Sequence, residues 1–474
     1  MAVDVAIALN RFGLGAIPGI PVAANPKHWL LDQLEKFEAA PARISALPPS
    51  RELVLAVREL GMERRERKSK AATQDAQAET AEKQLNGYRK AVRDQYVKAV
   101  DARMGVALAS TNSFAERLVH FWANHFALSI DKIAIVGLAG SFEFEAIRPH
   151  ILGNFADLLR ASTWHPAMLL YLDQAQSIGP NSPLAKRVGA RSNREIGLNE
   201  NLAREILELH TLGDRSAYSQ ADVTEFARAM TGLTVGGLGR ARVQRLVGSD
   251  AKPGEAIFVD ALHEPGTRRI CGRAYAQGGA KALSAIISDL ARHPATARHI
   301  AFKLARHFIA DDPPVSLVAK LEANFLKTGG DLPSLYRTLV EAPESWVPQQ
   351  AKFKSPWEWT ISALRALSIT AIPGKAQAAV ALFNQMGQPV WKPGSPKGYG
   401  DTAADWAGPA GLMRRVETAG RFAKLAANRV DARNLGTAIL PGSLTAATAE
   451  HIARAESPEQ GLALLLVSPE FLRR

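Results

Sequence analysis

Residues 199–210, Asn199-Glu200-Asn201-Leu202-Ala203-Arg204-Glu205-Ile206-Leu207-Glu208-Leu209-His210, are the stretch from which the fold class can be inferred. At about 100° per residue, Leu202, Ile206 and Leu209 fall on one side of a helix and the charged side chains on the other. This period is typical of an amphipathic α-helix that buries one face in a core. Helical periods recur along most of the chain, so we predict a mainly α fold, a multi-helix globular array.

Helix boundaries are marked by residues that stop or start a helix. Several helices are expected to end just before a proline that begins the next one, as at His165-Pro166, His293-Pro294 and Ser468-Pro469. Ser219 and Asp222 have the spacing of a capping box at the start of another helix. Glycines and β-branched residues break the helical pattern between 232 and 275, which predicts a small two-stranded β excursion near residues 255–272.

The chain has 474 residues, enough for two average domains. We predict N-terminal helices over residues 1–110, with a charged, projecting helical segment that is most polar between Glu63 and Glu82. Residues 111–474 are predicted to form the main helical domain, which contains the candidate site. One continuous domain is the alternative.

Composition restricts the class of protein. With 47% hydrophobic and 22% charged residues, the chain is globular rather than disordered. The single cysteine, Cys271, excludes an intramolecular disulfide and a cysteine-rich metal site. No apolar run reaches the roughly 18 residues that a membrane span needs. Because the N-terminus shows no signal peptide, a cytoplasmic location is expected, with export left open.

The chain is basic, with a formal net charge of +12 and a pI of about 9.8. This balance favours an anionic ligand or polymer as a partner, although an ordinary solvated surface gives the same totals. The basic residues of one predicted helix face are Arg298, His299, Lys303 and Arg306. That face is expected to line an anion site, to pair with an acidic surface or to contact solvent.

The charged face of the 199–210 helix is the first candidate site. Glu200, Arg204, Glu205 and Glu208 lie within an arc of about 140°. Three glutamates share one arginine there, so a carboxylate is left for a metal, a cationic substrate or acid–base catalysis. The alternative is an ordinary helix whose charged residues pair with one another in solvent.

The helix predicted over residues 113–126 is the second candidate. Glu116, His120 and Asn124 fall on one stripe, and Glu116 and His120 have the i, i+4 spacing that places two metal ligands on one helix face. His125 and His210 point toward apolar sides and are expected to be core groups. The chain contains no zinc-protease, serine-hydrolase or nucleotide-binding motif, so no motif identifies a reaction.

Several blocks, in order along nearly the whole chain, resemble the bacterial domain-of-unknown-function 1800 family. They are Ala8-Leu-Asn-Arg-Phe-Gly-Leu-Gly-Ala16, Phe121-Trp-Ala-Asn-His-Phe126, His165-Pro-Ala-Met-Leu-Leu-Tyr-Leu-Asp173, Lys352-Phe-Lys-Ser-Pro356 and the stretches 199–213, 222–232, 263–266 and 293–308. The resemblance implies a mainly helical protein, with a sulfatase-like or phosphatase-like partner protein and with many exported relatives. It also implies a histidine followed by a carboxylate at His263-Glu264. It implies no particular activity.

These observations lead to one main hypothesis and one alternative. We predict an enzyme-like polar pocket where the two candidate helices meet, with the His263-Glu264 loop as its lid and Arg204 orienting the substrate. A divalent metal ion is predicted to bind Glu116, His120, Glu205 and His263, and the expected reaction is metal-assisted hydrolysis. The alternative is a non-catalytic scaffold or binding protein for an anionic polymer or a protein partner.

Overall fold

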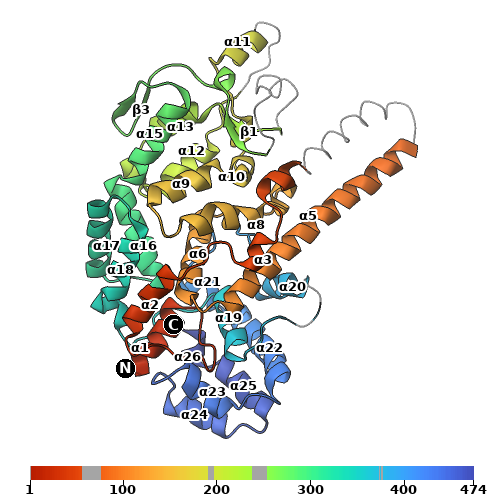
Figure 1. The fold of residues 1–474 in the computed structure, drawn as a ribbon, viewed down its shortest axis with the longest axis vertical. Helices are drawn as coiled ribbons and strands as arrows, with labels where there is room; N and C mark the ends of the chain where they lie inside the picture. The colour runs from red at the N-terminus through yellow and green to blue at the C-terminus, as the bar shows by residue number, and fades with distance from the viewer. Residues whose placement is uncertain (1, 56–75, 190–196, 238–253, 373, 375–376) are drawn as a thin grey trace.

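The computed structural model describes residues 2–55, 76–189, 197–237, 254–372, 374 and 377–474. The fold is mainly α, which confirms the prediction, and the short strands lie together in one region (Figure 1). The strands and α13 (Gln220–Met230) lie at one end of the molecule, and α22 (Pro409–Ala426) to α25 (Pro458–Leu466) lie at the other. Among the described helices, none combines the length and the apolar character that a membrane span requires.

The remaining elements, in chain order, have the following bounds. The helices before the strands are α1 (Ala2–Ile7), α2 (Pro26–Glu35), α3 (Ala42–Ser45), α5 (Ala76–Ala109), α6 (Ser113–His125), α7 (Ile133–Val136), α8 (Ala139–Ser141), α9 (Phe155–Trp164), α10 (Pro166–Tyr171), α11 (Pro183–Gly189) and α12 (Asn201–Glu205). Those after the strands are α15 (Gly279–Ala291), α16 (Pro294–Phe308), α17 (Val315–Thr328), α18 (Leu332–Glu341), α19 (Pro356–Ala366), α20 (Gln377–Met386), α21 (Ala403–Trp406), α23 (Ala432–Ile439), α24 (Ala446–Ala453) and α26 (Pro469–Leu472). The π-helical turns are η1 (Ala8–Phe12), η2 (Phe142–Ile147) and η5 (Ile206–His210), and the 3-10 turns are η3 (Arg148–His150), η4 (Gln174–Gln176), η6 (Arg215–Ala217), η7 (Asp260–Leu262) and η8 (Pro343–Trp346).

The predicted helix boundaries are present. The Nδ1 of His165 accepts a hydrogen bond from the Ala167 amide at the start of α10, at 3.2 Å. His293 caps α16 in the same way through the Ala295 amide, at 3.1 Å. In both cases the capping residue is extended and proline follows, so the preceding helix ends there. The capping box of Ser219 and Asp222 also forms, at the start of α13.

The strands form two separate pairs rather than the single predicted one. β1 (Leu233–Val235) pairs antiparallel with β2 (Ala256–Phe258), and β3 (Arg268–Ile270) pairs antiparallel with β4 (Arg273–Tyr275). The predicted strands near 256 and 270 therefore do not pair with each other. The reason is the two-residue turn Cys271-Gly272, where φ is 46° and 79°, because two such left-handed residues join adjacent strands directly.

The buried apolar side chains form one connected cluster that extends from Ile7 to Phe471. It includes residues on both sides of the predicted domain boundary at residue 110, and that division stays a prediction. The polar stretch from Glu63 to Glu82 lies for the most part outside the described residues. The last part of this stretch, from Ala76, belongs to α5, which extends away from the body of the molecule (Figure 1).

A largely buried carboxylate, that of Glu358, joins distant parts of the chain. Its Oε1 pairs with the guanidinium of Arg117 in α6, and it also accepts a hydrogen bond of 2.9 Å from Nη2 of Arg474. Arg117 donates in turn to the carbonyl oxygen of Asn10 at 3.3 Å. Glu358 is also the third residue of the capping box that begins α19 at Ser355. One side chain thus links the N-terminal segment, α6, α19 and the residue at position 474.

Replacing Glu358 with Gln should lower the free energy of unfolding by about 3–5 kcal/mol, because two buried guanidinium groups lose their counter-charge. Urea denaturation at pH 7 measures the change. The matched control is Glu341→Gln, which removes the carboxylate of the exposed pair with Arg337 at 3.8 Å. That control should change the free energy of unfolding by less than about 1 kcal/mol. Equal losses in the two variants would contradict the role assigned to Glu358.

Candidate functional site

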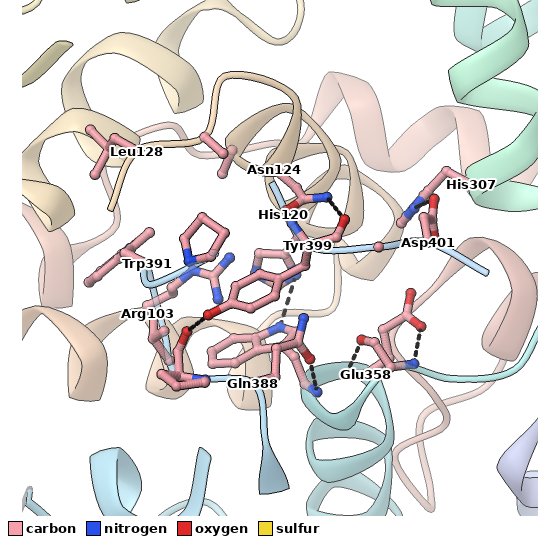
Figure 2. A pocket seen from close by; sticks show the side chains of 18 residues that line it. Arg103, His120, Asn124, Leu128, His307, Glu358, Gln388, Trp391, Tyr399 and Asp401 are labelled. Atoms are coloured by element: carbon pink, nitrogen blue, oxygen red, sulfur yellow. Dashed lines mark hydrogen bonds and ion pairs between the residues drawn. The ribbon is translucent and has the colours of Figure 1, made fainter. Parts of the chain in front are cut away.

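A small cavity lies where α5, α6, α16 and α19 meet the segment 388–401 (Figure 2). Its volume is about 90 Å³. The polar residues that line it are Arg103, His120, Asn124, His307, Ser355, Glu358, Gln388, Tyr399 and Asp401. The apolar and aromatic residues that line it include Ala123, Leu128, Trp357, Pro389, Trp391 and Pro393. Polar groups from five segments therefore converge on an otherwise apolar space, which is the usual composition of a ligand site.

The 388–401 segment forms one wall because it is held to α6. The side-chain amide of Asn124 donates to the carbonyl oxygen of Tyr399 at 3.0 Å and accepts from the Tyr399 amide at 2.8 Å. Gly398 has a φ of 85°, and a Cβ atom added there would lie 2.4 Å from the Asn124 carbonyl oxygen. Only glycine allows this approach. Asn124 thus anchors one wall of the cavity, and its role as a catalytic residue stays a prediction.

His120 enters the cavity from α6 with a defined tautomer. The indole Nε1 of Trp357 donates a hydrogen bond to its Nδ1 at 3.2 Å. Because an indole can only donate, Nδ1 carries the lone pair and Nε2 carries the proton. Desolvation, followed by the charges of Arg103 and Arg148, holds the pKa of His120 well below its usual value. The imidazole is therefore neutral at pH 7 and offers an N–H donor.

His307 has the opposite arrangement. Its Nδ1 donates to Oδ2 of Asp401 at 2.9 Å, so the lone pair lies on Nε2, which is buried and has no partner among the described residues. Burial lowers the pKa of His307. The negative charge of Asp401 acts in the opposite direction but does not outweigh burial. Burial alone would raise the pKa of Asp401, but His307 and Lys352 outweigh it and lower that pKa to about 2. At pH 7 the pair is thus a neutral base oriented by a carboxylate.

Arg103 brings positive charge to the cavity. Its guanidinium carbon lies 4.1 Å from the ring centre of Trp357 and 5.6 Å from that of Trp391. Its Nε donates to Oε1 of Glu143 at 2.8 Å, and Trp391 donates to the same carboxylate at 2.8 Å. Trp391 has a φ of 51°, a strained conformation for an aromatic residue. Such strain concentrates at ligand sites, which agrees with the position of Trp391 in this wall.

Two of the predicted site residues, His120 and Asn124, line this cavity, and Glu116 does not. Glu116 is buried one turn away from His120, where both its oxygens accept from Arg148, at 2.6 and 2.9 Å. Arg148 also donates to the carbonyl oxygens of Glu38 and Ala39. The pair therefore connects α6 to the segment after α2, and the predicted role of Glu116 as a metal ligand finds no support in its contacts.

The predicted acidic face lies elsewhere, on α12 and η5. Glu200 accepts from Thr224 at 2.6 Å and from Arg204 at 3.0 Å, and Glu208 pairs with Arg215 at 2.8 Å. Burial, followed by the charge of Glu208, raises the pKa of Glu205. Of the three glutamates on this face, Glu205 is the one that has no ion-pair partner among the described residues. Residues 197–201, with Asp173 and Gln176, line a separate open hollow.

The predicted lid does not cover the cavity. The Nδ1 of His263 donates to the Thr231 carbonyl oxygen at 2.8 Å, and Glu264 accepts from the amide and the side chain of Asn181 at 2.7 and 2.6 Å. These bonds hold the loop against the turn that precedes α11 and against Thr231, directly after α13. Within the described parts of the chain, no three histidine, cysteine, aspartate or glutamate side chains are placed to hold a metal ion. The predicted ligand set of Glu116, His120, Glu205 and His263 is thus not brought together.

The histidines predicted to be core groups are buried. His125 and His210 are each 1% exposed, and their ring centres lie 6.1 Å apart. The predicted basic face of α16 is divided: Arg298 is exposed, whereas Nε2 of His299 donates to the Leu209 carbonyl oxygen at 3.1 Å. Burial lowers the pKa of Lys303 to about 8. The four residues do not form a uniform solvent-facing surface.

Sequence reasoning missed Arg103, Trp357, His307 and Asp401. Arg103 belongs to a long polar helix whose charges look solvated, and a single tryptophan or histidine in a helix carries no signal of its own. The long, proline-rich segment that contains Asp401 was the available indication, because such a segment is rarely a passive connection. The residues that contact this segment lie far away in the sequence, so the spacing of residues could not identify them.

Comparison with known protein families finds a match over nearly the entire chain. The model of a family described as "Protein of unknown function (DUF1800)" matches residues 7–473. No curated protein and no solved structure matches the chain. The match confirms the family to which the sequence blocks pointed.

The buried histidines should make the fold sensitive to acid. Burial lowers the pKa of His210 to about 3 and that of His299 to about 4. Below the ordinary value of about 6.5, the unfolded chain binds protons that the folded chain does not, so stability falls as the pH drops toward about 4. Between its pKa in the folded chain and its ordinary pKa, each such histidine lowers the free energy of unfolding by about 1.4 kcal/mol for each pH unit of acidification.

Urea denaturation at pH 7, 6 and 5 tests this expectation. His210→Phe should flatten the pH dependence by about one histidine's slope, and replacement of the exposed His451 by Asn should leave it unchanged. A His210→Phe variant that loses stability on acidification as steeply as the wild type would show that this histidine is not the cause.

Proposed function

The chain belongs to the DUF1800 family, whose description assigns no activity, and we propose that its cavity hydrolyses a small molecule by general acid–base catalysis. The single observation that carries the proposal is the presence of two neutral imidazoles with opposite tautomers in one cavity. His120 presents an N–H donor, and His307 presents a lone pair. A donor and a base are the two groups that acid–base hydrolysis requires.

His307 would act as the base. An unpaired buried lone pair costs about 1–3 kcal/mol, and a bound water molecule would supply the missing donor to Nε2. In the proposed step this water gives its proton to Nε2 while its oxygen attacks the substrate. Asp401 holds the ring in the required tautomer and stabilises the imidazolium that forms. The proton then passes from Nε2 to the leaving group.

His120 would act on the opposite side of the reacting bond. Its Nε2–H can donate to the oxygen on which negative charge develops, and the neutral ring keeps this donor available at pH 7. Arg103 adds a positive charge in the same space, where low polarity strengthens its effect. Hydrolysis by imidazole groups needs no metal ligand set, so it does not depend on the four ligands predicted from the sequence.

The size of the cavity limits the substrate. Pockets for drug-sized ligands usually measure about 300–1,000 Å³. The volume here is about 90 Å³, which suits a small molecule or one end of a longer one. The sulfatase-like or phosphatase-like partner protein stays a prediction, since no described contact bears on it.

Replacing His307 with Gln should lower kcat by about 10²–10⁴-fold, because it removes the base. Activity is measured with p-nitrophenyl acetate, p-nitrophenyl butyrate and p-nitrophenyl phosphate, and thermal melting checks that the variant folds. In the wild type, activity should fall as acidification protonates His307. The matched control, replacement of the exposed His451 by Gln, should keep wild-type kcat.

Two outcomes would contradict the proposal. The first is a folded His307→Gln variant that hydrolyses one of these substrates with the kcat of the wild type. The other is binding of these substrates without turnover, which would favour the alternative of a non-catalytic binding protein.

A further inference from the structure

One indole positions two of the polar groups of the cavity. The Nε1 of Trp357 donates to Nδ1 of His120 at 3.2 Å, and the two rings meet edge to face at 5.3 Å. The guanidinium of Arg103 lies over the same indole, 4.1 Å from its ring centre. Phe383 supports the indole from α20, at 4.6 Å between ring centres. Trp357 therefore contacts both the imidazole and the cation.

Both groups present only hydrogen-bond donors to the cavity. Nδ1 of His120 is occupied, so its free nitrogen is the protonated Nε2. Nε of Arg103 is occupied by Glu143, so its free edge consists of the two Nη groups, for which no partner is found among the described residues. A guanidinium has no acceptor atom. At this end of the cavity a ligand therefore meets donors from both side chains.

The carboxylates nearby are already engaged and leave no free acceptor at this end. Both oxygens of Glu143 accept from Nε of Arg103, and one also accepts from Trp391. Glu358 is engaged by Arg117 and Arg474. Desolvation, followed by the charges of the nearby arginines, keeps the pKa of His120 well below its usual value, so the ring donates from Nε2 without carrying a charge. An edge that offers only donors, one of them a guanidinium, is complementary to an oxyanion.

We propose that the substrate carries a carboxylate or phosphate group that binds to Nη of Arg103 and to Nε2–H of His120, and that Trp357 is the positioning residue for both donors. This inference rests on the cavity of the proposed function and adds the class of its substrate. The planar guanidinium is suited to bind two oxygens of such a group at once. The reacting bond then lies toward His307, at the part of the cavity that Asp401 lines.

The test uses Trp357→Phe, which keeps an aromatic ring under Arg103 and removes the N–H donor to His120. In the full-length wild type, ¹⁵N NMR of the histidine side chains should show His120 with its proton on Nε2. In Trp357→Phe that preference should be lost. The control, Trp346→Phe, removes an indole N–H that donates to the Val340 carbonyl oxygen, and the His120 signals should not change. An unchanged tautomer in Trp357→Phe would overturn the positioning role.

Calorimetric titration with acetate and, separately, with inorganic phosphate tests the substrate class. Trp357→Phe should weaken binding about tenfold, which corresponds to about 1.4 kcal/mol. Arg103→Met should weaken binding further, and Trp346→Phe should bind as the wild type does. Binding of acetate alone assigns a carboxylate, and binding of phosphate alone assigns a phosphate. If neither anion binds the wild type, or if Arg103→Met binds as tightly as the wild type, the inference is overturned.

These results are separable from those that test hydrolysis. Anion binding that depends on Arg103, without turnover of any ester, would overturn the proposed hydrolysis and leave this inference in place. Turnover of p-nitrophenyl acetate that depends on His307, without binding of either anion, would overturn this inference alone.

Discussion

The carboxylate of Glu358, held between the guanidinium groups of Arg117 and Arg474, is the interaction on which the arrangement of the cavity depends. Removing charged groups from water is costly, and the cost is offset only where each charge has a close partner and further hydrogen bonds. Arg117 has such bonds to the carbonyl oxygens of Asn10 and Gly13, so the ion pair also holds the N-terminal segment. Since Glu358 belongs to the capping box of α19, the same network places the first turn of that helix.

The first turn of α19 carries Trp357, and this connects the buried charges to the chemistry of the cavity. Trp357 contacts His120 and Arg103, which come from α6 and α5. The third side of the cavity comes from the 388–401 segment, which Asn124 and His307 hold through Tyr399 and Asp401. Desolvation in this space, followed by the charges of Arg103, Arg148 and Arg117, favours the neutral form of His120, and the charge of Glu358 opposes them. The network that supports the fold thus also sets the electrostatic character of the site.

Part of the candidate site could be predicted from the sequence. The helical period placed His120 and Asn124 on one polar stripe of α6, and both line the cavity. The same reasoning selected Glu116, which lies on that stripe but is sequestered by Arg148 from the segment after η2. It also selected the acidic arc of Glu200 to Glu208, whose members Glu200 and Glu208 pair with nearby residues at the surface. A helical wheel identifies a face, but it contains no information about which distant residue covers that face.

The sequence by itself determined the helical class, the family, the helix boundaries at His165-Pro166 and His293-Pro294, the capping box at Ser219, and the burial of His125 and His210. Apart from the family, these properties follow from backbone geometry and from the period of apolar side chains, which act over a few residues. Only the tertiary structure decided that Arg103, His120, His307 and Asp401 share one cavity and that the predicted metal ligands do not meet. Ion pairing, desolvation and the tautomer of a histidine depend on contacts between residues hundreds of positions apart, and no local pattern specifies those contacts.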